Sequence, residues 1–156
     1  MGHSVEEKTV DIVQNKKARF EYEILETLEA GIVLAGTEVK SIRQKKVSIS
    51  EAYGRIRDGE PFLVGVNITI YDKGNRFNHE PARDRKLLLH KQEIKRLTGK
   101  LKERGLTLVP LRMYFKNGRV KVLLGLAKGK AKYDKRKTIQ KRESDREIQR
   151  IMKNRR

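Results

Sequence analysis

The chain has 156 residues, with 38 Lys and Arg against 20 Asp and Glu, and a formal net charge of +18. It contains no cysteine, which excludes disulfide bonds and thiolate metal sites. No apolar run approaches the roughly 18 residues of a membrane-spanning helix, and the N-terminal stretch lacks the apolar region of a signal peptide. We therefore expect a cytoplasmic protein that binds a polyanion and not a membrane.

Charge divides the chain into two predicted parts, a domain at residues 1–127 and a basic tail at residues 128–156. The tail carries 13 Lys and Arg against 4 Asp and Glu, half of the net charge. Its few large apolar residues cannot offset the entropy lost on ordering, so we expect it to be disordered when free and helical when bound. The domain is long enough for one hydrophobic core.

In the first half of the domain, the residue pattern predicts two strands and a helix after a polar N-terminal stretch. Residues 20–28 alternate aromatic or aliphatic side chains with glutamates, which predicts a strand. Glycines bound a second short strand at 30–36. Val39 and Ile42 lie three residues apart, which predicts a short helix over 37–46.

A hairpin and a loop follow. Apolar residues alternate over 62–70, which predicts a strand. The turn residues 58–60 connect it to the strand before, and a three-residue loop would set Ile56 opposite Phe62. Residues 72–85 are polar and predict a loop.

The next segment predicts an amphipathic helix. Ile94, Leu97 and Leu101 fall on one helical stripe. Gly105 stands where such a helix would end.

Asn117-Gly118 is the strongest hairpin signal in the chain. A two-residue turn sets Lys116 opposite Arg119 and Tyr114 opposite Lys121, and the same register would set Leu111 opposite Leu124. One face is then apolar: Leu111, Met113, Phe115, Val120, Val122 and Leu124. The other is polar: Arg112, Tyr114, Lys116, Arg119 and Lys121.

About six short strands with two helices predict a mainly β fold with added helices. The pattern fits a small Greek-key β-barrel of the oligonucleotide-binding (OB-like) type, for which five strands are the first candidate.

The polar hairpin face combines four cations with Tyr114, the pattern used for stacking and phosphate contacts on RNA. Lys116 and Arg119 are like charges directly opposite each other, which is unfavourable unless an anion lies over them. The alternative is an ordinary solvated sheet face, and the charge of the whole chain favours nucleic acid. Glu29 either accepts hydrogen bonds from base edges or pairs with a lysine.

Enzymatic readings find little support, and we expect no catalytic residue, cofactor or metal. The sequence has no Walker loop, Rossmann fingerprint, nucleophile elbow or zinc-protease motif. His79, with Glu80 and Asp84 nearby, could form a weak metal or nuclease group. A loop that positions its own Arg83 and Arg85 is the favoured interpretation.

Several strings resemble the SsrA-binding protein family, in the same order over nearly the whole chain. They are the run at residues 15–43, then "NHEP", "RKLLLHKQEI", "VKVLLGLAKGKAKYDKR" and "RIMKN". Members of this bacterial family bind transfer-messenger RNA, which is part tRNA and part message. They deliver it to ribosomes stalled on messages without a usable stop codon, and they are not enzymes. Their fold is an OB-like barrel with added helices.

The resemblance also implies which residues bind RNA. Four residues match positions that contact the tRNA-like part: Tyr22, Glu29, Leu89 and Lys121. Three match a neighbouring basic run: Asn15, Lys16 and Lys17. Three more complete the predicted RNA-binding set: Arg85, Lys86 and Tyr114.

In the family, the tail follows the empty message channel of the ribosome. The residues matched to its opening segment are Lys128, Lys130, Lys132, Tyr133, Asp134, Lys135 and Arg136. Ile151 and Met152 match an apolar pair that matters for function, and helical spacing would group them with Ile148. Ala131 stands where the family usually has lysine, so one phosphate contact is in doubt.

The implied partners are transfer-messenger RNA and the stalled ribosome, with its rRNA, decoding region and mRNA channel. Elongation factor Tu is expected as a partner through the RNA, and the protein as a monomer. Two rivals stay open at this point: a structural ribosomal protein, and a small metal-dependent nuclease at His79 and Glu80.

Overall fold

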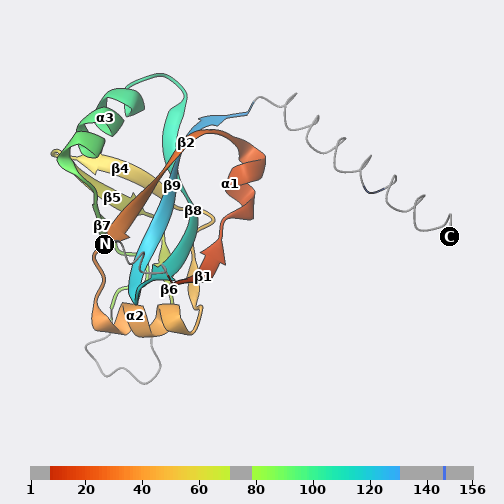
Figure 1. Ribbon diagram of the computed structural model, residues 1–156, viewed down its shortest axis with the longest axis vertical. Coiled ribbons are helices and arrows are strands. Elements are labelled where there is room, and N and C mark those ends of the chain that lie inside the picture. Colours follow the sequence, from red (N-terminus) through yellow and green to blue (C-terminus); the bar gives the residue numbers. More distant parts are fainter. Residues whose placement is uncertain (1–7, 71–78, 131–145, 147–156) are drawn as a thin grey trace, which may run out of the picture.

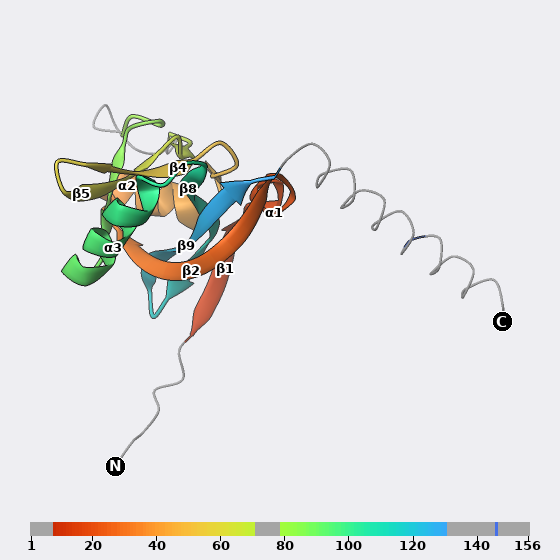
Figure 2. The same cartoon turned by 90° about the horizontal axis from the view of Figure 1, so that it is seen from above.

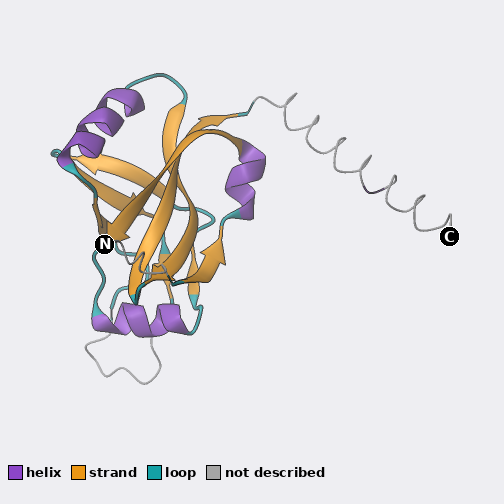
Figure 3. Ribbon diagram, viewed as in Figure 1, coloured by secondary structure: helices purple, strands orange, loops and turns teal. Residues whose placement is uncertain are grey.

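The computed structural model describes residues 8–70, 79–130 and 146. Figures 1 and 3 show strands that wrap into a barrel, with helices at its periphery. The helices are α1 (Lys16–Glu21), α2 (Gly36–Arg43) and α3 (Lys91–Leu101). The strands are β1 (Thr9–Gln14), β2 (Tyr22–Ile32), β3 (Val47–Ser48), β4 (Tyr53–Arg57), β5 (Glu60–Val64), β6 (Asn67–Ile68), β7 (Arg85–Leu88), β8 (Leu106–Lys116) and β9 (Arg119–Gly129).

The main sheet closes on itself. Its order is β1-β8-β4-β5-β7-β2-β9, and β9 also pairs with β8. Six strands therefore form the ring, one more than the five-stranded candidate, and β1 is an extra strand beside β8. Pairing between strands far apart in sequence, such as β2 with β9, gives the mainly β, OB-like barrel that the sequence predicts.

The β8–β9 hairpin has the predicted turn. Asn117 and Gly118 both have positive φ, 51° and 80°, as a two-residue hairpin turn requires. Lys116 pairs with Arg119 and Tyr114 with Lys121, which confirms the register near the turn.

Further from the turn, the predicted register is wrong. Pro110 pairs with Leu124 and Arg112 with Leu123, so Leu111 is an extra, bulged residue and does not face Leu124. A bulge exchanges the faces on which side chains lie. Leu111 accordingly packs in a cluster outside the barrel, not in the main core.

The β4–β5 hairpin is also tighter than predicted. Asp58 and Gly59 have φ of 52° and 75° and form a two-residue turn, so that Arg57 pairs with Glu60. Ile56 therefore pairs with Pro61 and not with Phe62. The strand predicted over 62–70 ends early, since β5 stops at Val64 and the short β6 follows Gly65.

Some elements were missed and some were joined. The polar N-terminal stretch contains β1, which pairs with β8, and α1, which begins after Asn15. The two strands predicted over 20–28 and 30–36 are replaced by the single strand β2. The helices predicted around 37–46 and 94–101 are present as α2 and α3.

Two hydrophobic clusters lie on opposite sides of the sheet. The larger one fills the barrel and includes Ile42, Leu63, Leu97 and Met113. The smaller one lies beneath α1 and consists of Ala18, Val109, Leu111 and Ala127, with Tyr22, Ile24 and Leu123 packed against it. Figures 1 and 2 show α1 and α3 on opposite sides of the barrel.

The sheet extends beyond the predicted domain boundary at residue 127. Lys128 of β9 pairs with Glu23 of β2 and with Leu106 of β8. The backbone N–H of Lys130 donates to the Glu21 carbonyl at 3.0 Å. The first residues assigned to the tail therefore belong to the barrel. The other predicted tail residues lie outside the described part of the chain: Lys132, Tyr133, Asp134, Lys135, Arg136, Ile151 and Met152.

Candidate nucleic-acid interface

A row of residues crosses four adjacent strands at the predicted RNA-binding hairpin. Gly31 of β2 pairs with Lys121 of β9, Lys121 pairs with Tyr114 of β8, and Tyr114 pairs with Asp11 of β1. Paired residues on antiparallel strands have neighbouring side chains on the same face. The row therefore combines a lysine, a tyrosine and a carboxylate beside the glycine of β2.

Glu29, two residues before Gly31, is held by this row. Its carboxylate accepts a hydrogen bond from the Tyr114 hydroxyl, and Lys116 Nζ lies 3.2 Å from Glu29 Oε1. The hydrogen bond from Tyr114, followed by the hydrogen bond and charge of Lys116, lowers the pKa of Glu29 even though burial opposes this. Of the two interpretations, the described structure has Glu29 paired with a lysine.

Tyr114 differs from the prediction. We expected an exposed ring that could stack on a base, but Tyr114 is 2% exposed. The Arg112 guanidinium lies 4.5 Å from the centroid of its ring, and Arg112 Nη1 donates to Asp11 Oδ1 at 3.0 Å. Tyr114 is therefore a buried support for Glu29, while Arg112 covers its ring.

Glu29 and Lys121 line a groove with the third matched residue, Leu89. The groove encloses about 640 Å³. Its walls come from β2, from the β7–α3 junction and from β9: Thr27, Leu28, Glu29, Gly31, Leu88, Leu89, His90, Glu93 and Lys121. We name it the Lys121 groove. It offers a cation, carboxylates and aliphatic side chains on one surface.

Leu88 is one of the residues of this groove that the sequence interpretation missed. It is 54% exposed, whereas its neighbour Leu87 is 1% exposed. The run Leu87-Leu88-Leu89 is apolar throughout, but Leu87 and Leu88 lie in β7, in which successive side chains point to opposite faces. Treating the run as a strand would have placed one of these two leucines on the outer face.

A second group of predicted residues lies elsewhere. Asn15, Lys17 and Tyr22 line a groove of about 280 Å³ between α1 and residues 50–53. Tyr22 and Glu29 are seven residues apart on β2, which corresponds to roughly 23 Å along a strand. These predicted RNA-binding residues thus form two patches, one near each end of β2.

Within this second groove, Asn15 and Lys17 have different surroundings. Asn15 is 3% exposed. Its Oδ1 accepts from the Ala18 N–H at 3.1 Å and caps α1, while its Nδ2 donates to the Pro110 carbonyl at 2.9 Å. Lys17 is exposed, and a hydrogen bond from its Nζ to Glu51 Oε1, at 2.5 Å, raises the pKa of Lys17. Asn15 holds the backbone, and Lys17 presents charge.

Arg85 is fully buried, in contrast to its predicted contact with RNA. Its Nε donates to Glu38 Oε2 at 2.6 Å. Its terminal nitrogens donate to four backbone carbonyls: Val66, Glu80, Pro81 and Arg83. Arg85 therefore organises the loop before β7. The other cations of the set, Lys16 and Lys86, are exposed, and Lys86 Nζ lies 3.2 Å from Glu60 Oε1.

Glu38 completes this buried network. It is fully buried and also accepts from the Ala35 N–H at 2.8 Å and from Arg83. Burial would raise the pKa of Glu38, but the hydrogen bonds from Arg83, Ala35 and Arg85 lower it below the ordinary glutamate value. The carboxylate is therefore kept ionised against the guanidinium groups.

The environment of His79 favours the loop interpretation over a metal site. Its Nδ1 lies 3.0 Å from Thr37 Oγ1, and its Nε2 lies 2.8 Å from the Ile68 carbonyl oxygen. Because a carbonyl only accepts, Nε2 carries the proton and both ring nitrogens are engaged. Among the described residues, no group of three or more His, Asp or Glu side chains could hold a metal ion.

Comparisons with known proteins identify the family. The model of the SmpB protein family matches residues 12–154. An SsrA-binding protein of Levilactobacillus brevis is 53% identical over 155 residues, 98% of this chain and 99% of that protein. An SsrA-binding protein of Desulforudis audaxviator is 60% identical over 144 residues, 92% of this chain and 93% of that protein.

A solved structure described as "tmRNA-SmpB: a journey to the center of the bacterial ribosome" is also similar. It has a TM-score of 0.65 and 55% sequence identity, and the match covers 77% of this chain and 85% of that chain. None of the helices in the described residues is long and apolar enough to cross a membrane. With matches of this extent in sequence and in fold, the chain belongs to the SmpB protein family.

Proposed function

We propose that this chain binds the tRNA-like part of transfer-messenger RNA and delivers that RNA to stalled ribosomes for trans-translation, in the cytoplasm and as a monomer. The observation that carries the proposal is the match to SsrA-binding proteins at more than half identity over nearly the full chain. The similar solved structure, described as tmRNA-SmpB, supports the same partner. The protein acts by binding, without catalysis, a cofactor or a metal.

The exposed residues of the two patches make the contacts to RNA. In the Lys121 groove, Lys121 neutralises a phosphate and Leu88 and Leu89 pack against an unstacked base or a ribose. In the other patch, Tyr22 and Lys17 provide a partly exposed ring and a cation. An A-form duplex is recognised mostly by shape and backbone contacts, and two separated patches suit that mode.

The buried members of the predicted set have a different role. Asn15, Arg85 and Tyr114 do not touch the RNA but hold the surfaces that do. Asn15 caps α1 beside Lys17, Tyr114 orients Glu29, and Arg85 fixes the loop that leads into β7. Positioning residues of this kind matter because binding requires the contacts to be formed in advance.

The tail follows the empty mRNA channel in this proposal. Its phosphate contacts along rRNA neutralise the like charges that oppose helix formation when it is free. The body alone therefore holds transfer-messenger RNA, and the tail serves the ribosome step.

RNA that co-purifies with the chain from bacterial cells tests the proposal. We expect transfer-messenger RNA, in amounts well below the number of ribosomes. A chain that co-purified with every ribosomal subunit at equal stoichiometry would be a structural ribosomal protein. Metal-dependent cleavage of the RNA would instead identify a nuclease.

The division between body and tail is tested by replacing Ile151 and Met152 together with serine. RNA affinity in a filter-binding assay should not change, because the body supplies it. Peptide tagging in a reconstituted translation system should be lost, because the tail does not seat. Full tagging would contradict an ordered functional tail, and a loss of RNA affinity would contradict the division of roles.

A further inference from the structure

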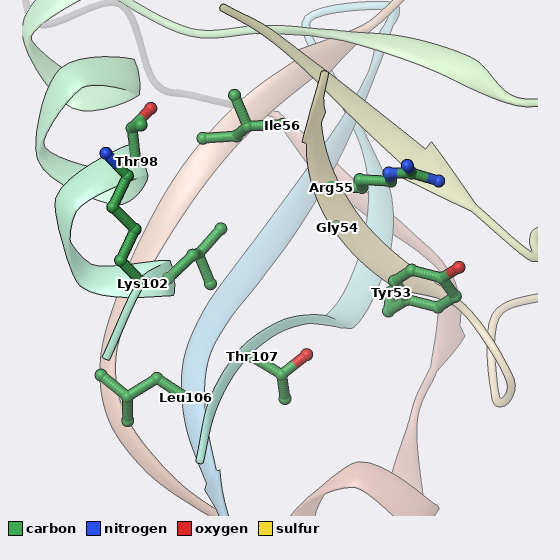
Figure 4. A pocket seen from close by; sticks show the side chains of 9 residues that line it. Tyr53, Gly54, Arg55, Ile56, Thr98, Lys102, Leu106 and Thr107 are labelled. Carbon is green, nitrogen blue, oxygen red and sulfur yellow. The ribbon is translucent and has the colours of Figure 1, made fainter. Parts of the chain in front are cut away.

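A third groove lies between α3 and β4 (Figure 4). It shares Tyr53 and Thr107 with the groove that Asn15, Lys17 and Tyr22 line, and it shares no residue with the Lys121 groove. It encloses about 420 Å³. Ile56, Leu101 and Leu106 supply its apolar surface and Lys102 supplies a cation, whereas the Arg55 side chain points to the other side of β4 (Figure 4). We name it the Lys102 groove. A cavity of about 150 Å³ accepts a benzene ring, so this space is large enough for two or three aliphatic side chains.

We propose that residues 143–152 of this chain dock in the Lys102 groove when the protein is not on the ribosome. The proposal goes beyond the proposed function, in which the same segment serves only the ribosome step. It rests on three observations: the apolar and charged pattern of the segment, the chemistry of the groove, and the place where the chain leaves the barrel.

The segment is the least basic part of the tail. Three of the four acidic residues of the tail fall within 143–152, against two arginines. In a helix, which turns by about 100° per residue, Ile148, Ile151 and Met152 form one stripe. Asp145 and Glu147 then flank that stripe on its two sides.

The two arginines of the segment lie on the opposite side of the same helix. Arg146 and Arg150 are each two residues from Ile148, about 160° around the helix axis. Arg146 is described by the structure, where its backbone is helical and its side chain exposed. The segment therefore has an apolar face with acidic edges and a basic back.

The groove complements this face. Its apolar surface is flanked by Lys102, which follows α3. Lys102 forms no ion pair with another described residue. An acidic edge of the helix thus meets a cation of the groove, whereas the rest of the tail, which is strongly basic, is repelled there. Charge complementarity selects this segment over its neighbours.

The chain leaves the barrel beside the groove. Lys128 pairs with Leu106, a groove residue, and Ala127 pairs with Thr107, which also lines the groove. From Lys130 to Ile148 there are 18 residues, and a flexible chain of that length spans roughly 23 Å on average. The tether gives an effective concentration in the millimolar range, so even a weak contact is populated.

Docking has a consequence for the tail that rests on the proposed function. The apolar pair Ile151 and Met152 cannot occupy the groove and the ribosomal channel at once. The groove therefore withholds the tail from other RNA until the many phosphates of the ribosome compete for it. The tail gains its helix from a surface in both cases, in agreement with the expectation that it cannot fold by itself.

A paramagnetic label measures this contact directly. Because the chain contains no cysteine, Arg146→Cys creates a single site for a nitroxide label, on the face away from the groove. We expect the label to broaden the NMR signals of amides in Thr98, Leu101 and Leu106 of the full-length protein. The amides of the Asn117-Gly118 turn should keep their intensity.

Two further variants test the two halves of the contact. Ile151→Ser with Met152→Ser should abolish the broadening, and these changes lie in the tail, so they leave the body folded. Lys102→Glu should weaken docking roughly two- to five-fold, the range of a surface ion pair. Its matched control is Lys95→Glu, an exposed lysine on the same helix outside the groove, which should have no effect.

Several outcomes would overturn the proposal. Absence of broadening at the groove would do so, as would broadening that survives the serine variant. A mixed sample tests for contacts between molecules. It contains nitroxide-labelled protein without isotopes and isotope-enriched protein without nitroxide. Broadening in this sample would mean that the tail of a second copy occupies the groove. RNA affinity, measured separately by filter binding, reports on the proposed function and is expected to be the same for all these variants.

Discussion

Glu38 and Glu29 are two carboxylates with similar partners in opposite surroundings. Both accept hydrogen bonds from cationic side chains, and both have a pKa below the ordinary value. Glu38 has a fully buried side chain, whereas that of Glu29 is 35% exposed. The first binds Arg85, which is itself buried, and the second binds Lys116 at the surface.

The difference shows which ion pair can exchange partners. Opening the Glu38 network would leave a charge and several carbonyls without water or partners, which is costly. Opening the Glu29 network exposes its groups to water or to a ligand, at little cost. A predicted site residue that contacts Glu38, such as Arg85, thus stabilises the fold, whereas one beside Glu29, such as Lys121, can contact a ligand. The predictions below test this contrast.

The largest effect is expected at the buried pair. Arg85→Ala leaves Glu38 as an uncompensated buried charge and removes the donors to four carbonyls, so it should destabilise the protein by about 3–5 kcal/mol. Urea unfolding measures this. Lys86→Ala is the matched control, because it removes an exposed neighbour whose ion pair with Glu60 contributes less than about 1 kcal/mol. Equal effects at the two positions would remove the distinction.

At Lys121, which lines the groove beside the Glu29–Lys116 pair, the expected effect is on RNA. Lys121→Ala should weaken binding of the tRNA-like RNA by about 1.5–3 kcal/mol, the range of a hydrogen bond to a charged group, without unfolding the barrel. It should also reduce the slope of log affinity against log salt by about 1. Filter binding at several salt concentrations gives both values. Lys95→Ala, on the exposed side of α3, should leave both unchanged.

Acid should remove the stability that the two carboxylates contribute, to a larger extent for Glu38 than for Glu29. The folded-state pKa of each lies below the unfolded value, so the unfolded state binds more protons and stability rises with pH in that window. The contribution is complete above the unfolded value of about 4.3 and is lost as the pH falls through the folded-state pKa. Glu38→Gln should flatten this acid limb more than Glu29→Gln. The measurement is the urea midpoint from pH 7 to pH 3, and a steeper limb in Glu38→Gln would contradict the assignment.

The smallest effect is expected at the support of Glu29. Tyr114→Phe keeps the buried ring and removes one hydroxyl, so it should cost about 1 kcal/mol of stability. Without that donor the pKa of Glu29 should rise, which NMR titration of the carboxyl detects. If the variant instead lost several kcal/mol, Tyr114 would resemble the buried network more than the surface one.

Local turn chemistry was the most predictable part of the fold. Asn117-Gly118 set the register of the last hairpin because a two-residue turn with positive φ leaves only one pairing near it. The same chemistry at Asp58-Gly59 was present, but including Glu60 in the turn shifted the predicted pairing by one residue. The strand β1 was missed because it is stabilised by β8, about 100 residues later, and no local pattern reports that partner.

The sequence predicted several residues that group at the site, but it did not predict which of them are exposed. Motif resemblance pointed to Glu29, Leu89 and Lys121, and the structure brings these three into one groove. It could not tell a residue that touches a ligand from one that holds the fold, since both are retained in a motif. Alternation placed Tyr114 on the outer face, but the burial of Tyr114 depends on Arg112 and β1 covering it.

Among the strand pairings of the barrel, that between β4 and β8 has the fewest paired residues. β4 meets β8 at the single pair Gly54 and Leu108 among the described residues, while β9 is bonded along both edges to β8 and β2. A Cβ at Gly54 would lie 2.4 Å from Leu108 Cδ2, so contact there depends on close backbone approach more than on a hydrogen-bonded ladder. Amide hydrogen exchange should accordingly be fastest along β4 and slowest in β9. The barrel can open beside the Lys102 groove while the β2–β9–β8 face stays intact, so such opening leaves in place the walls that β2 and β9 contribute to the Lys121 groove.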